Sequence, residues 1–338
     1  MFNRLLIDVT EKILADDSFR ISYEDACRLA ALPEDETTDL IMCANKVRHK
    51  FKQNHIVNCS ITNAKSGCCT EDCAFCAQSA YHETDIASHD LLSAERLVED
   101  AVSLYESGAT EFSMVTSGYM LTDAEMATIG RAANQIRKQT DLAICSSLGV
   151  LTESRAGQLK ESGVSAYHHN LETARSFFDQ VCTTHPYEDD VETVRIAKAA
   201  GLKTCCGGIL GLGESWEQRV ELAITLRDLD VDSIPINFLN PIAGTRMAGR
   251  PLLSPMEALK CIALFRLINP RKDITICGGR EITLRDLQSW IFAAGANGML
   301  VGNYLTTQGR DIKADMAMIK DLGFIAVEGV SVRTPRQH

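Results

Sequence analysis

The chain has 338 residues, 45% of them hydrophobic, and a formal net charge of −11. Its acidic balance argues against nucleic acid as a partner, and no apolar run approaches the roughly 18–20 residues of a membrane span. Thirteen cysteines without a secretion signal disfavour a disulfide scaffold, so we expect a reducing, cytoplasmic location and thiols that bind metal.

The first 52 residues predict helices, because apolar residues recur at helical spacing on both sides of Pro33. We expect an N-terminal helical extension over 1–52, a barrel domain over 53–325 and a C-terminal tail over 326–338. The pattern leaves two roles open for the extension, which are to cap the barrel bottom and to contribute to a dimer contact.

Short apolar or β-branched runs then alternate with longer amphipathic stretches. The candidate strands are 55–61, 111–117, 142–148, 165–171, 203–209, 233–239, 274–279 and 298–303. Eight such βα units predict an α/β fold, a TIM-type (β/α)8 barrel. An open doubly wound sheet is the alternative, and the lack of a GxGxxG motif after the first run weakens it.

Polar and thiol residues mark the C-terminal ends of five candidate strands. They are Cys145, Asn170, Cys205, Asn237 and Cys277. In a barrel, loops from all strands converge at that rim, so these residues are expected around one site.

A cysteine-rich loop follows the first candidate strand and reads SGCCTEDCAFCAQS. Cys69, Cys73 and Cys76 are spaced C-x3-C-x2-C, and three thiolates hold three irons of a cubane cluster while leaving the fourth open to another ligand. A structural zinc site completed by His82 is the alternative interpretation. Cys68 is expected to be a spare thiol.

This loop resembles that of the radical S-adenosylmethionine (SAM) superfamily, including an aromatic residue before the last cysteine, Phe75. The resemblance implies a [4Fe–4S] cluster whose open iron chelates SAM. One electron from the cluster then cleaves the sulfonium and yields a deoxyadenosyl radical that abstracts hydrogen. The loop motif by itself specifies no particular reaction.

Further blocks resemble the biotin synthase family across about residues 50–320. They read YHHNLET, TTHPYEDDVETVRIAKAAGLKTCCGGILGLGES, SIPINFLNPIAGT and GREITLRDLQSWIFAAGANGMLVGNYLTT. The resemblance implies a homodimeric barrel enzyme, a sulfurtransferase that converts dethiobiotin to biotin. It also implies a second, sacrificial iron–sulfur cluster and an electron donor such as flavodoxin or ferredoxin.

The same resemblance assigns roles by position. Asn170 and Glu172 are expected to contact SAM, with Asn170 also reaching the substrate, and Arg195 is expected to face the SAM carboxylate. Asn237 and His168 are expected to bind the substrate, although the family usually has Asn at position 168. Taken singly, each residue has a structural alternative, such as a surface charge for Arg195 and a strand-end cap for Asn237.

The second cluster departs from the family's commonest form, which uses three cysteines and an arginine. Cys145 and Cys205 keep two ligand positions, whereas Ser113 and Thr275 occupy the other two.

Two additional cysteines compensate for this loss. Cys59 lies on the first candidate strand and Cys277 on the seventh, so Cys59, Cys145, Cys205 and Cys277 come from strands of one parity, which share layers in a barrel. We therefore expect an all-cysteine auxiliary cluster of the 4Fe type rather than a [2Fe–2S] cluster. Plain packing of these thiols is the alternative.

The other cysteines are expected to have packing roles. Cys206 should face away from the barrel interior, with a reserve role as a ligand if the strand ends there, and Cys27, Cys43, Cys182 and Cys261 are interpreted as bystanders. Two competing functions stay open at this point. One is a related radical SAM enzyme of the hydrogenase-maturation or methylornithine-forming kind, and the other is a non-enzymatic iron–sulfur electron carrier.

Overall fold

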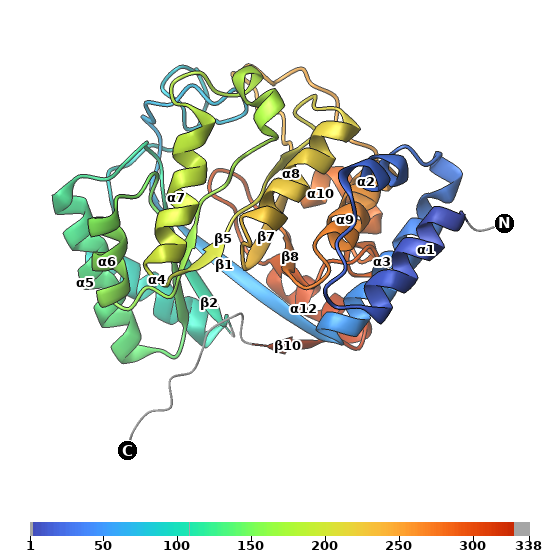
Figure 1. Ribbon diagram of the computed structural model, residues 1–338. Coiled ribbons are helices and arrows are strands. Elements are labelled where there is room, and N and C mark those ends of the chain that lie inside the picture. Colours follow the sequence, from blue (N-terminus) through green and yellow to red (C-terminus); the bar gives the residue numbers. More distant parts are fainter. Residues whose placement is uncertain (1–2, 108, 328–338) are drawn as a thin grey trace.

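The computed structural model describes residues 3–107 and 109–327 (Figure 1). Its strands form one sheet in the order β10-β1-β2-β3-β4-β5-β7-β8-β9, and β1 also pairs with β9, which closes the sheet into a barrel. All of these strand pairs are parallel. The strands are β1 (His55–Lys65), β2 (Glu111–Thr116), β3 (Ala143–Ser147), β4 (Ala166–His168), β5 (Lys203–Cys205), β6 (Gly208–Leu210), β7 (Ser233–Phe238), β8 (Asp273–Ile276), β9 (Gly298–Leu300) and β10 (Ile325–Val327).

The predicted (β/α)8 barrel is confirmed, with one strand or strand pair overlapping each of the eight predicted runs. The fifth run differs, because it divides into β5 and β6. The interruption lies opposite Pro235 of β7, which has no backbone N–H to donate to the ladder. Gly207 is also required there, since a Cβ at this position would lie 1.9 Å from the Pro235 carbonyl oxygen. Strands β7 and β8 are therefore the sixth and seventh strands of the barrel.

Twelve α-helices are described, and those after β1 surround the barrel. They are α1 (Arg4–Ala15), α2 (Tyr23–Ala30), α3 (Thr37–Lys52), α4 (Ala94–Glu106), α5 (Asp123–Gln139), α6 (Glu153–Glu161), α7 (Tyr187–Ala199), α8 (Trp216–Asp228), α9 (Pro255–Ile268), α10 (Arg280–Leu284), α11 (Trp290–Ala293) and α12 (Ile312–Asp321). Short 3-10 turns occupy Glu34–Glu36, Arg175–Gln180 and Arg285–Leu287.

Hydroxyl side chains fix where several barrel helices begin. Ser93, Thr122, Ser215 and Ser254 each accept a hydrogen bond from the backbone N–H three residues ahead, at the starts of α4, α5, α8 and α9. Such caps satisfy one of the four N–H groups that a helix start leaves unpaired, which sets the direction in which each helix leaves the rim.

Helices α1–α3 lie along the side of the barrel, next to α8 and α9 (Figure 1). Lys260 of α9 donates to the carbonyl of Leu32, and Arg227 of α8 donates to the carbonyl of Ile21 at 2.8 Å. The extension therefore packs against outer helices, and its last helical residue, Lys52, also pairs with Asp273 at the start of β8 at 2.6 Å.

The end of the chain also contributes to the sheet. Ile325–Val327 forms β10, which pairs with β1, so the first residues of the expected tail belong to the sheet. The remainder of the expected tail, residues 328–338, lies outside the described residues. Within the described part of the chain, no helix combines the length and the apolar character needed to cross a bilayer.

Candidate active site

The C-terminal ends of the strands surround a cavity of about 300 Å³. The cysteine-rich loop forms one wall and contributes Cys69, Cys73 and Cys76. The opposite walls carry the predicted residues His168, Asn170, Glu172, Asn237 and Cys277. The structure thus brings together most of the residues that the sequence singled out, although they come from four separate segments of the chain.

The cysteine-rich loop is folded back on itself. Cys69 N–H donates to the Gln78 carbonyl at 2.9 Å, Ala80 N–H returns a bond to the Cys69 carbonyl at 2.8 Å, and Cys76 N–H closes a tight turn onto Cys73. Cys68 has a φ of +51° and is exposed. Its thiol lies outside the set that lines the cavity.

A clamp of hydrogen bonds holds this loop against residues 181–184. Asp72 accepts from the backbone N–H of Thr183 at 2.8 Å and from its hydroxyl at 2.6 Å. Arg246 donates to the Asp72 carbonyl, and Ala74 N–H donates to the Val181 carbonyl at 2.8 Å. Burial alone would raise the pKa of Asp72, but the Thr183 hydrogen bonds hold it well below its usual range. The loop is therefore positioned by an ionised, buried carboxylate.

The spacing of the loop thiols disfavours a single-metal site. Ligands around one tetrahedral Zn²⁺ at about 2.0–2.3 Å lie only about 3.3–3.8 Å from one another. Among the described residues, no three loop ligands converge within 4.8 Å, and the one compact ligand group contains none of the three motif cysteines. His82, the proposed fourth zinc ligand, instead makes a 2.8 Å hydrogen bond to the Cys76 carbonyl through Nδ1. More widely separated thiols suit a polynuclear cluster, whose ligands bind different irons.

Burial and hydrogen bonds in the cavity walls affect the protonation and the orientation of their polar side chains. Glu172 has a φ of +59°, and burial raises the pKa of its carboxyl group to about 8. Asn170 accepts from Gly207 N–H at 3.2 Å and donates to Glu172 at 3.5 Å. Burial lowers the pKa of His168 to about 4, so its imidazole is neutral at physiological pH.

Two predicted residues lie toward a second, more apolar lobe. Asn237 accepts from Gly278 N–H at 2.9 Å. Its side chain therefore caps a strand end, as the structural alternative for this residue expected. Phe75 lines this lobe, whose other walls include Ile209, Leu239 and Leu305. Asn237 and Cys277 border both lobes, which links the lobe to the thiol-lined cavity.

The structure contradicts the prediction for Arg195. This residue lies on the outer face of α7, its side chain is 64% exposed, and its ion-pair partner is Glu192 of the same helix at 3.7 Å. The inward face of α7 is set by Asp190, Val191 and Val194, and Arg195 follows Val194 by 100° of helical rotation. Arg195 therefore does not reach the cavity.

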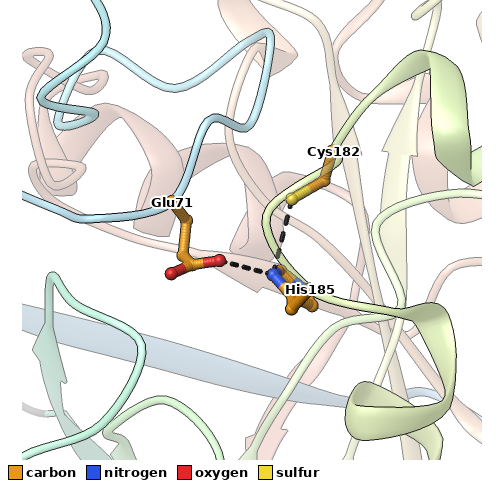
Figure 2. Close-up of side chains that lie close together, drawn as sticks. All are labelled: Glu71, Cys182 and His185. Atoms are coloured by element: carbon orange, nitrogen blue, oxygen red, sulfur yellow. Dashed lines mark hydrogen bonds and ion pairs between the residues drawn. The ribbon is translucent and has the colours of Figure 1, made fainter.

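Cys182, interpreted as a bystander, lies at the cavity instead. Its Sγ is 3.8 Å from the Sγ of Cys73 and 3.4 Å from Nδ1 of His185 (Figure 2). The same Nδ1 lies 2.6 Å from Oε2 of Glu71, a residue of the cysteine-rich loop. The C-x2-H spacing of Cys182 and His185 was the one sequence signal for this group.

A smaller cavity of about 80 Å³ lies deeper in the barrel and holds the four predicted auxiliary thiols. They are Cys59 on β1, Cys145 on β3, Cys205 on β5 and Cys277 directly after β8. All four are buried, at 2–8% exposure. The first, third, fifth and seventh strands thus place one thiol each around a single space.

The four thiols lie in one buried environment. Burial is the main cause that raises the pKa of Cys59, followed by Glu111 and then by the three other thiols, so those three lie within electrostatic reach of Cys59. Burial likewise raises the pKa of Cys277 to about 12. Nearby, the hydroxyl of Ser113 is buried without a hydrogen-bond partner among the described residues. A buried hydroxyl without a partner, on the residue paired with Cys145 across the sheet, fits a site that holds a further group beside the four thiols.

The other thiols match packing roles. Cys206 is fully buried in the main apolar core, on the outer side of β5, as expected from its place next to Cys205. Cys27, Cys43 and Cys261 contact or belong to the same core.

Two protein families match the sequence. The Radical SAM superfamily matches residues 64–226, and the Biotin and Thiamin Synthesis associated domain matches residues 235–325. Among curated proteins, a biotin synthase from Syntrophus aciditrophicus is 61% identical over 312 residues, which cover 92% of this chain and 96% of that protein. A biotin synthase from Citrifermentans bemidjiense is 51% identical over 324 residues, covering 96% and 98%.

Solved structures share the fold at low identity. A methylornithine synthase has a TM-score of 0.81 at 19% identity and covers 94% of this chain and 97% of its own. A maturase of the [FeFe]-hydrogenase has a TM-score of 0.81 at 16% identity, covering 97% and 77%. These two matches establish the barrel architecture, whereas the close curated relatives establish the family. The chain belongs to the biotin synthase family.

Proposed function

We propose that this biotin synthase inserts sulfur into dethiobiotin from an auxiliary iron–sulfur cluster held by Cys59, Cys145, Cys205 and Cys277. The observation that carries this proposal is the convergence of four buried thiols, from alternate strands, on one cavity. That cavity shares His168, Pro235 and Cys277 as walls with the larger cavity at the cysteine-rich loop. A sulfur donor in the inner cavity would thus lie next to the space for substrate.

The residues of the larger cavity fit a SAM-binding cluster. Cys69, Cys73 and Cys76 supply three thiolates, and the separation of their donor atoms suits different irons of one [4Fe–4S] cluster rather than one ion. When bound, the reduced cluster and SAM supply a deoxyadenosyl radical that removes hydrogen atoms from unactivated carbons. The clamp at Asp72 keeps the three thiols in a fixed arrangement for that group.

The chain's own side chains position the small molecules. Glu172 and Asn170 present a carboxyl and an amide that suit the hydroxyl groups of a ribose. Neutral His168 lies between the two cavities, where it donates or accepts a hydrogen bond without adding charge. The apolar lobe behind Phe75 and Leu305 suits the aliphatic chain of dethiobiotin, and Asn237 at its border suits the polar ring.

Four thiolates favour a 4Fe auxiliary cluster over the [2Fe–2S] type. Thr275 lines the inner cavity and Ser113 is buried nearby, where the family's commonest form has two of its ligands. Neither side chain replaces a thiolate or a guanidinium, whereas Cys59 and Cys277 complete a four-sulfur set. All-thiolate coordination is the usual environment of a [4Fe–4S] core.

Partners and location follow the family. We infer that the substrate is dethiobiotin, that a flavodoxin or ferredoxin donates the electron, and that the chain forms a homodimer in the cytoplasm. The described cysteines are all free thiols, which suits a reducing compartment.

The test is an anaerobic incubation of the reconstituted, reduced protein with SAM and dethiobiotin. Formation of both 5′-deoxyadenosine and biotin supports the proposal. Deoxyadenosine without biotin would instead indicate a related radical SAM enzyme, and neither product from protein with intact clusters would indicate an electron carrier. A Cys73→Ser variant that still cleaves SAM would contradict the loop assignment.

A further inference from the structure

We propose that Glu71, Cys182 and His185 form a mononuclear site for a divalent first-row metal ion, which is additional to the two iron–sulfur clusters and lies beside the loop cluster, since the Sγ of Cys182 is 3.8 Å from that of Cys73. Their donor atoms all lie within 4.8 Å of one another, and they are the only such group among the residues that the structure describes. Figure 2 shows the carboxylate, the thiol and the imidazole pointing toward one common space. The Sγ of Cys182 is 3.4 Å from Nδ1 of His185, within the range of about 3.3–3.8 Å between ligands of one tetrahedral ion.

The outer partners of these residues follow the pattern of a metal site. A histidine that binds a metal through one ring nitrogen usually donates the other N–H to a carboxylate, which fixes the ring. Nδ1 of His185 faces Cys182 and Glu71, while Nε2 lies 3.4 Å from Asp190. Asp190 is itself held by His169 at 2.8 Å.

Packing holds the proposed ligands in place without metal. The His185 ring contacts Tyr119 and Phe178, with ring centroids 5.8 and 5.5 Å away. The thiol of Cys182 is 2% exposed, and the side chains of Glu71 and His185 are 13% and 12% exposed. One of these groups is buried and two are largely shielded from solvent, on two loops that the Asp72 clamp already joins, so the site differs from a cluster of solvated surface acids.

Charge in the cavity gives an independent reason for a cation. The cavity is lined by the carboxyl groups of Glu71, Asp190 and Glu172, the last mostly protonated at pH 7, and its basic side chains are histidines, with no lysine or arginine among the described residues. The one arginine expected there, Arg195, lies on the outer face of α7. A divalent ion at this wall would supply positive charge and keep a coordination position open toward the cavity.

Ligand chemistry selects the kind of ion. One thiolate, one imidazole and one carboxylate suit Zn²⁺ or Fe²⁺ rather than Mg²⁺ or Ca²⁺, which prefer oxygen. Binding would release any proton on the thiol and on Nδ1, and the ion would replace the 2.6 Å hydrogen bond between His185 and Glu71. No electron transfer is involved.

The test uses the holoprotein with both clusters reconstituted, to which Zn²⁺ is added before unbound metal is removed. We expect one retained equivalent of zinc and an X-ray absorption spectrum at the zinc edge with one sulfur at about 2.3 Å and nitrogen or oxygen donors at about 2.0–2.2 Å. Iron and sulfide content should not change. Because iron does not contribute at the zinc edge, the clusters do not obscure this readout.

Variants identify the ligands. Asp190→Asn should weaken zinc affinity by about 10- to 100-fold, the usual cost of losing the outer partner of a metal-bound histidine. Cys182→Ser and His185→Gln should weaken it further. Cys43→Ser and His49→Gln, two matched changes on α3, should leave affinity unaltered.

Three results would overturn the site. These are no retained zinc, a shell of four sulfurs, or an affinity that neither Cys182→Ser nor His185→Gln alters. If a variant loses its clusters, the spectrum of the wild-type protein decides by itself. Since the readout is metal content and coordination, its failure leaves the sulfur-insertion proposal untouched.

Discussion

Replacing Asp72 with alanine should loosen the cysteine-rich loop and accelerate loss of its cluster. The change removes two hydrogen bonds from Thr183, at 2.8 and 2.6 Å, to an ionised carboxylate that is 8% exposed. Hydrogen bonds to charged groups contribute about 1.5–3 kcal/mol each, so the loop should lose about 3 kcal/mol at the lower bound. That loss corresponds to an about 100-fold larger population of the opened loop.

The assay follows how quickly an iron chelator abolishes SAM cleavage under anaerobic conditions, since the proposed mechanism assigns this activity to the loop cluster and not to the auxiliary one. We expect inactivation of Asp72→Ala to be about 100-fold faster than that of the wild type, by the same conversion of free energy to populations. Asp85→Ala removes an exposed carboxylate from the same segment and should behave as wild type.

A double-mutant cycle sharpens the test. Thr183→Val removes only the hydroxyl partner, so its effect should be smaller, and its combination with Asp72→Ala should be less than additive. Equal inactivation rates for Asp72→Ala and wild type, or strict additivity in the cycle, would refute the view that this clamp holds the thiols in place.

Three further outcomes follow from single groups. Cys277→Ala should lower iron content and abolish biotin formation while SAM cleavage persists. Cys206→Ala changes a core-facing neighbour of the proposed ligand Cys205, so this variant should keep its full iron content. Asp315→Ala leaves Arg280 buried without its 2.8 Å partner and should lower the free energy of unfolding by about 3–5 kcal/mol. Urea denaturation measures this loss, and an unchanged midpoint would contradict it. Burial raises the pKa of Glu172 to about 8, so its carboxyl group is mostly protonated at pH 7 and becomes ionised as the pH rises through that value. SAM affinity should therefore increase between pH 7 and pH 9 in the wild type, whereas a Glu172→Gln variant should show a flat profile.

The barrel was predictable because its signals are local. Each strand is a short apolar run between amphipathic helices, and parity along a strand fixes which side chains face inward. This reasoning placed Cys59, Cys145, Cys205 and Cys277 around one space, as the structure has them. The interruption between β5 and β6 was not predicted, because it depends on Pro235 of the neighbouring strand.

The errors at the site come from helix phase and from distant contacts. Arg195 is one residue beyond the inward-facing Val194, and a shift of one residue rotates a side chain by 100° on a helix. Cys182 lies 109 residues from Cys73 in sequence, so their 3.8 Å contact depends on how two loops meet at the rim. No periodic sequence pattern predicts a contact between two loops. The C-x2-H spacing marked the second loop only as a possible ligand segment.

The origin of the inserted sulfur tests the account most directly. The protein is reconstituted with isotopically labelled sulfide, freed of excess sulfide, and allowed a single turnover with SAM and unlabelled dethiobiotin under reducing conditions. The account predicts labelled biotin from the wild type and none from Cys277→Ala, although both proteins cleave SAM. Biotin without the label, or labelled biotin from the variant in equal yield, would contradict the claim that the four barrel thiols hold the sulfur donor.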